Sequence, residues 1–283
     1  MDRRNFMKAV GLMGLATMPG KKTKAGQSVS DKEFNAILID TTLCEGCEAC
    51  LDACSESNKL PEAVTDPVAG IENKTSPNQL AVVNMYNVED LEVTVKKQCM
   101  HCNQPACASA CLTNAMFKTE EGPVIWRADK CMGCRFCMLS CPYDIPKFEY
   151  EKVNPDIKKC NMCYDRIKDG DIPACAEACP AEAIVYGTRK DMLEEARRRI
   201  YQNPDDYVHH IFGEDEVGGA SVLYLSAVPF EKLGFKTKLG NEAMPKLTTD
   251  FLYSVPVIET LLPPFLLAIS FAAKKSKEAG EGK

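Results

Sequence analysis

Cysteine is the residue type whose number and spacing could carry chemistry in this chain. The run Cys131-Met-Gly-Cys134-Arg-Phe-Cys137-Met-Leu-Ser-Cys141-Pro142 has C-x2-C-x2-C-x3-C-P spacing. Such spacing brings three thiolates to one face of a cubane iron–sulfur cluster and directs the fourth, before the proline, to a second cluster. The run therefore predicts [4Fe-4S] chemistry and a partner run elsewhere in the chain.

Three further groups of four cysteines complete a total of sixteen. One repeats the spacing but has Ser55 after its last cysteine, one has a four-residue loop in its middle, and one is split by eleven residues and ends in Cys179-Pro180. These groups are Cys44, Cys47, Cys50 and Cys54; Cys99, Cys102, Cys107 and Cys111; and Cys160, Cys163, Cys175 and Cys179. The count predicts four [4Fe-4S] clusters with complete ligand sets, and no iron left open for a substrate.

In a two-cluster ferredoxin the last cysteine of each run binds the cluster held by the other run. Applied to the two inner runs and to the two outer runs, this rule predicts four ligand sets. They are set 1 (Cys44, Cys47, Cys50, Cys179), set 2 (Cys160, Cys163, Cys175, Cys54), set 3 (Cys99, Cys102, Cys107, Cys141) and set 4 (Cys131, Cys134, Cys137, Cys111). We therefore expect two pseudo-symmetric two-cluster units, one nested in the other.

Two other fates of the cysteines are less consistent with the pattern. Eight disulfides are typical of small secreted chains that lack C-x2-C-x2-C repeats. Structural zinc is held by pairs of C-x2-C knuckles rather than by triplets followed by C-P. His101 is the one histidine near the cysteines. It is not needed as a ligand, and we expect it to face solvent, with tuning of a neighbouring cluster as the alternative.

Composition limits the remaining functions. With 283 residues, 45% of them hydrophobic, the chain can bury one or two cores. A net charge of -6 argues against nucleic-acid binding. The sequence has no catalytic triad, P-loop or dinucleotide-binding glycine motif, so we do not expect catalysis by the chain alone. Basic residues beside the cysteines would favour thiolates, although about half fit ordinary solvated positions; they are Lys96, Lys97, Lys130, Arg135, Lys158 and Lys159.

Short elements surround the cysteine runs, and the predicted fold class is α+β with cluster-binding loops and a C-terminal membrane helix. Strands are expected at 36–40, 80–88, 183–187 and 222–228, and a hairpin is expected from 116–117 and 124–126. Thr188 is predicted to cap a helix that has Leu193, Ala196 and Ile200 on one face. The ferredoxin-like domain is predicted at 36–187, with an inner unit at 95–150 and an outer unit at 36–60 and 155–187. Residues 188–250 are expected to pack on this core and on partners.

Both ends of the chain indicate export and membrane association. Arg3-Arg4 and the apolar run 9–18 predict a twin-arginine signal over 1–25, and its cleavage is left open. Residues 251–273 are apolar, with Glu259 as their one charge, and a basic tail follows at 274–283. They predict a membrane anchor. Docking on a membrane partner without crossing is the alternative.

The cysteine pattern over 37–187 resembles the four-cluster beta subunits of bacterial membrane oxidoreductases, such as dimethyl sulfoxide reductase, polysulfide reductase and membrane-bound formate dehydrogenase. Residues 187–200 and 218–230 are similar to hydrogenase-2 iron–sulfur proteins and their relatives in sulfate- and metal-reducing bacteria. The resemblance implies an electron-transfer subunit on the periplasmic side of the cytoplasmic membrane. It also implies a multi-helix quinone-binding membrane subunit as one partner.

For the catalytic partner, the resemblance implies a nickel–iron uptake hydrogenase. The alternatives are a molybdopterin enzyme of the formate dehydrogenase or sulfur-compound reductase type, and a multihaem cytochrome in a cytochrome-linked menaquinone reductase. A soluble polyferredoxin or an iron–sulfur enzyme is the alternative from another class. The apolar C-terminal segment argues against the first, and the complete ligand sets argue against the second.

Overall fold

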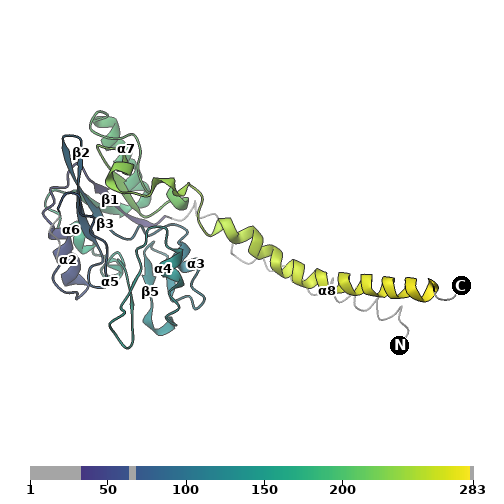
Figure 1. Cartoon of the computed structure of the whole chain (residues 1–283). Coiled ribbons are helices and arrows are strands. Elements are labelled where there is room, and N and C mark those ends of the chain that lie inside the picture. The colour runs from purple at the N-terminus through teal and green to yellow at the C-terminus, as the bar shows by residue number, and fades with distance from the viewer. Residues whose placement is uncertain (1–32, 64–67, 281–283) are drawn as a thin grey trace. The chain divides into compact units, whose positions relative to one another are not determined.

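A three-stranded sheet connects the two ends of the cysteine-rich region. The computed structural model describes residues 33–63 and 68–280, so the predicted export signal at 1–25 lies outside the described residues. The strands lie in the order β8 (Ile184–Thr188), β1 (Asn35–Asp40) and β9 (Val222–Leu225). β1, which Figure 1 labels next to α7 (Arg189–Gln202), pairs antiparallel with β8 and parallel with β9. All three strands were predicted, although β9 ends three residues earlier than expected.

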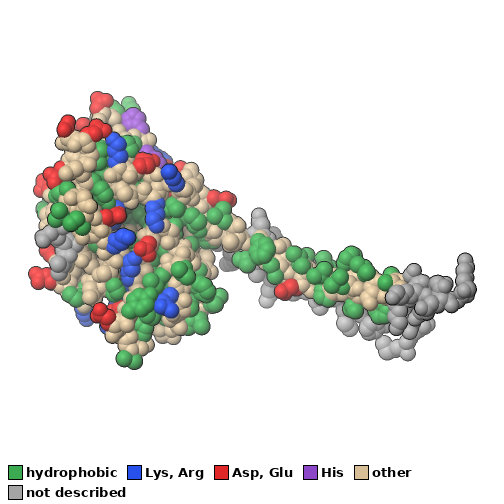
Figure 2. Space-filling model, viewed as in Figure 1, with side chains coloured by type: hydrophobic (Ala, Val, Ile, Leu, Met, Phe, Trp, Pro, Cys, Tyr) green, Lys and Arg blue, Asp and Glu red, His purple; other side chains and the backbone are tan. Residues whose placement is uncertain are grey.

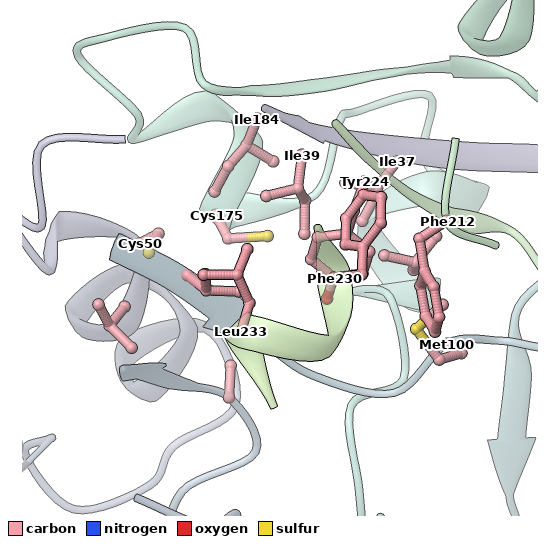
Figure 3. Packing of buried hydrophobic residues seen from close by; sticks show 14 of the residues in the cluster. Ile37, Ile39, Cys50, Met100, Cys175, Ile184, Phe212, Tyr224, Phe230 and Leu233 are labelled. Atoms are coloured by element: carbon pink, nitrogen blue, oxygen red, sulfur yellow. The ribbon is translucent and has the colours of Figure 1, made fainter. Parts of the chain in front are cut away.

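Alternate side chains of β1 enter two different cores, as the period of a strand requires. Ala36 and Leu38 pack with Met192 and Ala196 of α7 (Arg189–Gln202). Ile37 and Ile39 belong to a larger group of buried side chains on the other face. Figure 3 shows Cys50 and Cys175 at one end of this group, and Met100 with Phe212 at the other. The core of the sheet is thus continuous with the surroundings of the cysteines.

Three further pairs of strands form two-stranded antiparallel ladders. They are β2 (Val82–Val88) with β3 (Leu91–Lys97), β4 (Met116–Lys118) with β5 (Val124–Trp126), and β6 (Lys147–Phe148) with β7 (Ile157–Lys158). The hairpin of β4 and β5 and the strand β2 confirm the predictions. The strand β3 was not predicted. It ends two residues before Cys99 and carries Lys96 and Lys97.

Short helices accompany the cysteine loops. They are α2 (Ala49–Ser57), α3 (Ala106–Ser109), α4 (Phe136–Ser140), α5 (Tyr164–Lys168) and α6 (Ala174–Glu177). Helix α2 packs against α6, and α3 packs against α4. Single turns of 3-10 helix occur at η2 (Ala128–Lys130), η3 (Glu216–Gly218), η4 (Phe230–Leu233) and η5 (Thr237–Leu239). The observed class is a mixed α/β fold with small sheets.

The C-terminal helix α8 (Lys246–Gly280) continues through Pro256, Pro263 and Pro264. By length and composition, its stretch Lys246–Ala273 could cross a membrane. Apolar side chains along this stretch are exposed, and Figure 2 shows hydrophobic side chains over its visible face. The predicted apolar segment at 251–273 is therefore a helix whose apolar surface the described residues leave uncovered.

Helix α7 begins at the predicted cap. The hydroxyl oxygen of Thr188 accepts a hydrogen bond from the backbone N–H of Asp191 at 3.2 Å. Ala196 is fully buried, and Leu193 and Ile200 pack on the same core as Ala196. The prediction of a capped helix with this apolar face is confirmed.

Replacing Thr188 with alanine removes this cap and should lower the stability of the first turn of α7 by about 1 kcal/mol. Because amide exchange follows the free energy of local opening, the Asp191 amide should exchange about fivefold faster. Hydrogen exchange measured by mass spectrometry on a peptide over 188–196 checks this. The control Thr188→Ser keeps the hydroxyl and should exchange near the wild-type rate; equal acceleration in both variants would contradict the capping role.

Candidate functional site

All sixteen cysteines lie in the described part of the chain, and none is in a disulfide. Across residues 33–63 and 68–280, no three His, Cys, Asp or Glu side chains converge closely enough to hold a single metal ion. The cysteines instead join apolar side chains in three separate buried groups. Each group mixes cysteines from different runs, so the fold brings together thiols that are far apart in the sequence.

One cavity is lined by all four cysteines predicted as set 1, namely Cys44, Cys47, Cys50 and Cys179. The loop before α2 supplies the first two thiols, and α2 itself supplies Cys50. The other walls include Ile39 of β1 and Ile184 of β8. The strand pairing of β1 with β8 is therefore what carries Cys179 to the first run.

Charges from more than one cysteine run also act on the thiol of Cys102. Burial raises the pKa of Cys102, and the neighbouring thiolates of Cys99, Cys141 and Cys107 raise it further. These four cysteines are the predicted set 3. Cys141 comes from the run that begins at Cys131, so its presence here is a contribution from the other inner run.

Charges from another run also act on Cys137, in the predicted set 4, and on Cys54, in the predicted set 2. Burial raises the pKa of Cys137 to about 11, with further contributions from Cys111, Cys131 and Cys134. Burial also raises the pKa of Cys54 to about 11; the Lys96 charge opposes the rise, and Cys175 and Cys163 add to it. A thiol in such surroundings favours the protonated form, so holding several as thiolates requires a cation, as iron in a cluster would provide.

Thiol charges also act between the predicted sets, in the order 1, 2, 3, 4. The charge of Cys175 in set 2 acts on Cys50 in set 1. In the same way, Cys99 in set 3 acts on Cys160 in set 2. Cys137 in set 4 acts on Cys107 in set 3. Each predicted set except the last thus has a thiol whose pKa is raised by the charge of a thiol in the next set.

The same backbone turn recurs in all four runs. The residue directly before the second cysteine has a positive φ in each: 72° at Gly46, 47° at His101, 72° at Gly133 and 57° at Met162. Glycine adopts this conformation freely, whereas histidine and methionine pay about 1 kcal/mol or more. In the last run the turn lets the Met162 N–H donate to Cys160 Sγ at 3.4 Å. Strained backbone of this kind is typical of binding sites.

Backbone N–H groups also reach Cys111. The N–H groups of Ala115 and Met116 donate to its Sγ at 3.2 and 3.4 Å. Burial acts to raise the pKa of Cys111, but these bonds, together with the side-chain and backbone hydrogen bonds from Thr113, outweigh it and lower the pKa. N–H donors to sulfur favour the thiolate and are one means by which a protein sets a cluster potential.

His101 is fully buried, so the expectation that it faces solvent is wrong. Its Nδ1 accepts a hydrogen bond from the Val124 N–H at 2.9 Å, which places the ring proton on Nε2. Burial, followed by the charges of Lys159, Lys118 and Lys96, holds its pKa well below the usual value. The ring is therefore neutral. Its Nε2 is buried without a hydrogen-bond partner among the described residues.

Lys118 is a further basic residue that sequence reasoning missed. Its Nζ donates to the carbonyl oxygens of His101, Cys102 and Gly122 at 3.2, 3.1 and 2.7 Å. Burial lowers its pKa to about 7, although the thiolates of Cys102 and Cys99 oppose this. Lys118 lies seven residues beyond the nearest cysteine in the sequence, and no local pattern marks it as part of a cluster loop.

The donor sets fit [4Fe-4S] clusters in kind, since each offers thiol sulfur from four cysteines in a largely apolar, N–H-lined setting. Comparison with known proteins agrees. A model of a 4Fe-4S dicluster domain matches residues 92–189. A protein of Nitratidesulfovibrio vulgaris (strain Hildenborough) is 41% identical, covering 98% of this chain and 78% of that protein.

Two further relatives carry informative names. The hydrogenase-2 operon protein HybA of Escherichia coli O157:H7 is 35% identical, covering 82% of this chain and 83% of that protein. The iron–sulfur subunit of the nitrate-inducible formate dehydrogenase of Escherichia coli K12 is 36% identical, covering 67% of each chain. The chain therefore belongs to the family of [4Fe-4S] electron-transfer subunits that includes HybA and the formate dehydrogenase iron–sulfur subunits.

Proposed function

We propose that this chain carries four [4Fe-4S] clusters and relays electrons between a periplasmic catalytic subunit and a quinone-reactive membrane subunit. The proposal is supported by the cavity that Cys44, Cys47, Cys50 and Cys179 line together, and by thiol charges that act on Cys54, Cys102 and Cys137 from other runs. Bound clusters would supply one-electron transfer. The chain's own residues fix the order of the clusters, exclude water by burial, and donate N–H groups to sulfur.

The geometry of the short helices supports crossed ligation. Cys50 and Cys54 both lie on α2, four residues apart, so the helix rise separates them by about 6 Å along its axis. The fourth thiol is thereby carried away from the cluster of its own run. Helix α6, which packs against α2, carries Cys175. Cys54 therefore meets the cysteines of the last run, and we assign it to cluster 2.

The inner pair repeats this arrangement, which supports two nested units. Helix α3 carries Cys107, α4 carries Cys137, and the two helices pack together as α2 and α6 do. Cys111 and Cys141 follow their helices, as Cys54 and Cys179 follow Cys50 and Cys175. We assign the inner unit to 95–150 and the outer unit to 36–60 and 155–187. The extension 188–250 packs on the outer unit through α7 and β9.

The two ends of the row of clusters lie nearest to solvent. Cys47 in set 1 and Cys134 in set 4 are exposed, whereas sets 2 and 3 contain only buried or half-buried cysteines. Beside set 4, the apolar side chains of Leu112, Met132 and Leu139 are also exposed. Electrons would therefore enter and leave at clusters 1 and 4, where partner subunits can approach.

The relatives and the C-terminal helix support the partners. HybA belongs to a hydrogenase-2 operon, which favours a nickel–iron uptake hydrogenase as the catalytic partner. The formate dehydrogenase subunits support a molybdopterin enzyme as the second candidate. Helix α8 would anchor the chain beside a multi-helix membrane subunit. Arg3-Arg4 supports export by the twin-arginine route to the periplasmic side.

The four-cluster assignment predicts the metal content. Protein purified without oxygen should be brown and contain about sixteen irons per chain, because four cubanes hold four irons each. Iron and zinc are measured together by plasma mass spectrometry, and acid-labile sulfide is measured alongside. About twelve irons, or one zinc per chain, would overturn the assignment.

The proposed location predicts accessibility. Replacing Arg3 and Arg4 together with lysine should keep the protein inside the cell, because the twin-arginine route reads this pair. In wild-type spheroplasts, protease added outside should degrade the cluster domain, while a cytoplasmic marker protein stays intact. A wild-type cluster domain that resists protease until the cells are lysed would rule out the periplasmic side.

Crossed ligation predicts which cluster a serine disturbs. Cys111→Ser should perturb the cluster of Cys131, Cys134 and Cys137, because Cys111 belongs to set 4. Serine oxygen is a poorer iron ligand than thiolate, so that cluster should shift its potential or lose one iron. Paramagnetic resonance during a redox titration measures the change.

Each signal is first assigned by changes beside a single run, such as Arg135→Gln for cluster 4 and His101→Asn for cluster 3. Cys54→Ser is the companion variant, and should disturb the cluster of Cys160 and Cys163. If Cys111→Ser instead alters the signal that responds to His101→Asn, the inner pair is not crossed.

A further inference from the structure

Two Lys-Lys doublets precede cysteine runs. In each doublet one lysine is buried and the other is partly exposed. Lys96-Lys97 comes before Cys99, and Lys158-Lys159 comes directly before Cys160. Lys96 is 1% exposed and Lys159 is 6% exposed, and no other Lys or Arg in residues 33–63 and 68–273 is buried to this degree. Burying an ammonium group is unfavourable unless negative charge lies close to it.

The surface member of each doublet has an ordinary partner. The side chain of Lys97 is 18% exposed and pairs with Glu72 at 2.7 Å. The side chain of Lys158 is 29% exposed and pairs with Asp156 at 3.1 Å. These two lysines therefore serve as matched references for the buried pair.

The buried members donate to neutral oxygens. The Nζ of Lys96 donates to the Gln98 side-chain oxygen. The Nζ of Lys159 donates to the carbonyl oxygens of Val124 and Cys160 at 2.5 and 2.6 Å. These acceptors carry no formal charge, so they do not balance the positive charge of either lysine.

Lys96 lies between sets 1 and 2. It lines the cavity of set 1 together with Cys44 and Cys50. Its charge also acts on Cys54 and Cys160 of set 2. Burial acts to lower the pKa of Lys96, but the thiolates of both sets outweigh burial and raise it, so the side chain stays charged.

Lys159 lies between sets 2 and 3. Its Nζ donates a hydrogen bond to the backbone carbonyl oxygen of Cys160, in set 2. Its charge also acts on Cys107 and Cys141 of set 3. The charges that raise the pKa of Cys137, in set 4, are those of the other cysteines of its own set. No lysine is among the leading contributions to that pKa.

We propose that Lys96 and Lys159 are fixed counterions of the electron path, one at the junction of clusters 1 and 2 and one at the junction of clusters 2 and 3. The proposal rests on the four-cluster assignment. Each one-electron reduction adds a negative charge to a cluster, and a nearby buried positive charge favours the reduced form. Cluster 2 adjoins both lysines, clusters 1 and 3 adjoin one each, and cluster 4 adjoins neither.

The test uses the full-length protein with four variants: Lys96→Met and Lys159→Met, with Lys97→Met and Lys158→Met as their controls. Methionine keeps the length of the side chain and removes its charge. Anaerobic redox titration followed by paramagnetic resonance gives each cluster potential, and iron content shows that the clusters are retained.

The two buried-lysine variants should shift the reduction potentials of different, overlapping pairs of clusters. Lys96→Met should make clusters 1 and 2 harder to reduce. The equilibrium constant for their reduction should fall on the order of tenfold or more, and a tenfold fall corresponds to a potential 59 mV lower for one electron. Lys159→Met should do the same for clusters 2 and 3. Cluster 4 should stay unchanged in both variants, and the two control variants should shift every cluster less. Unchanged potentials of clusters 1 and 2 in Lys96→Met protein with full iron would overturn the role of Lys96.

A second variant covers the case in which Lys96→Met does not fold. Gln98→Glu keeps Lys96 in place and puts a carboxylate where its acceptor oxygen now lies. The Gln98 Nε2 has no partner among the described residues, so this change breaks no hydrogen bond of that atom. It should lower the potentials of clusters 1 and 2, as removal of the lysine charge does. Potentials that rise or stay the same would count against the proposal.

The titration of the wild-type protein distinguishes failure of the counterion role from failure of the four-cluster assignment. Four signals with about sixteen irons, together with unshifted variants, would overturn the counterion role and leave the four-cluster assignment intact. Fewer than four signals in the wild type would overturn the assignment itself, and the counterion proposal with it.

Discussion

The burial of many thiolates close together is the constraint on which the rest of this structure depends. In a low-dielectric interior, like charges repel strongly and each charged group loses its hydration. The raised pKa values of Cys50, Cys107 and Cys137 express this cost. Bound iron would offset it, because each thiolate would then contact a cation directly. Backbone N–H groups that donate to sulfur act in the same direction.

The central sheet brings together segments that are far apart in the sequence. Set 1 joins the first cysteine run to Cys179, and more than a hundred residues separate them in the sequence. The antiparallel pairing of β1 with β8 brings these ends together, and the parallel pairing with β9 covers the other edge of β1. Because both faces of β1 are packed, residues 36–39 are all apolar. β1, which carries no cysteine, therefore holds together the two segments of the proposed outer unit.

The sequence predicted the features that follow from local spacing. Cysteine intervals, the hairpin of β4 and β5 and the Thr188 cap depend on residues within a few positions of each other, and local physical chemistry is enough to place them. Burial depends on contacts with distant segments. No local signal shows that His101 is covered by Val124, or that Lys96 points inward while Lys97 reaches Glu72. The six basic residues beside the cysteines therefore looked equivalent in the sequence, although two of them are buried and four are not.

Burial also matters for how the proposed row of four clusters would conduct electrons in one direction. Ligand type would not distinguish the four proposed sites, because each predicted set consists of four cysteines. Differences in potential must therefore come from what surrounds each set. Sets 1 and 4 each have a cysteine exposed to solvent, whereas sets 2 and 3 have none. The buried lysines adjoin sets 1 to 3 and leave set 4 without one. Solvent access at both ends and fixed positive charge toward one end make the row asymmetric, although its ligands repeat.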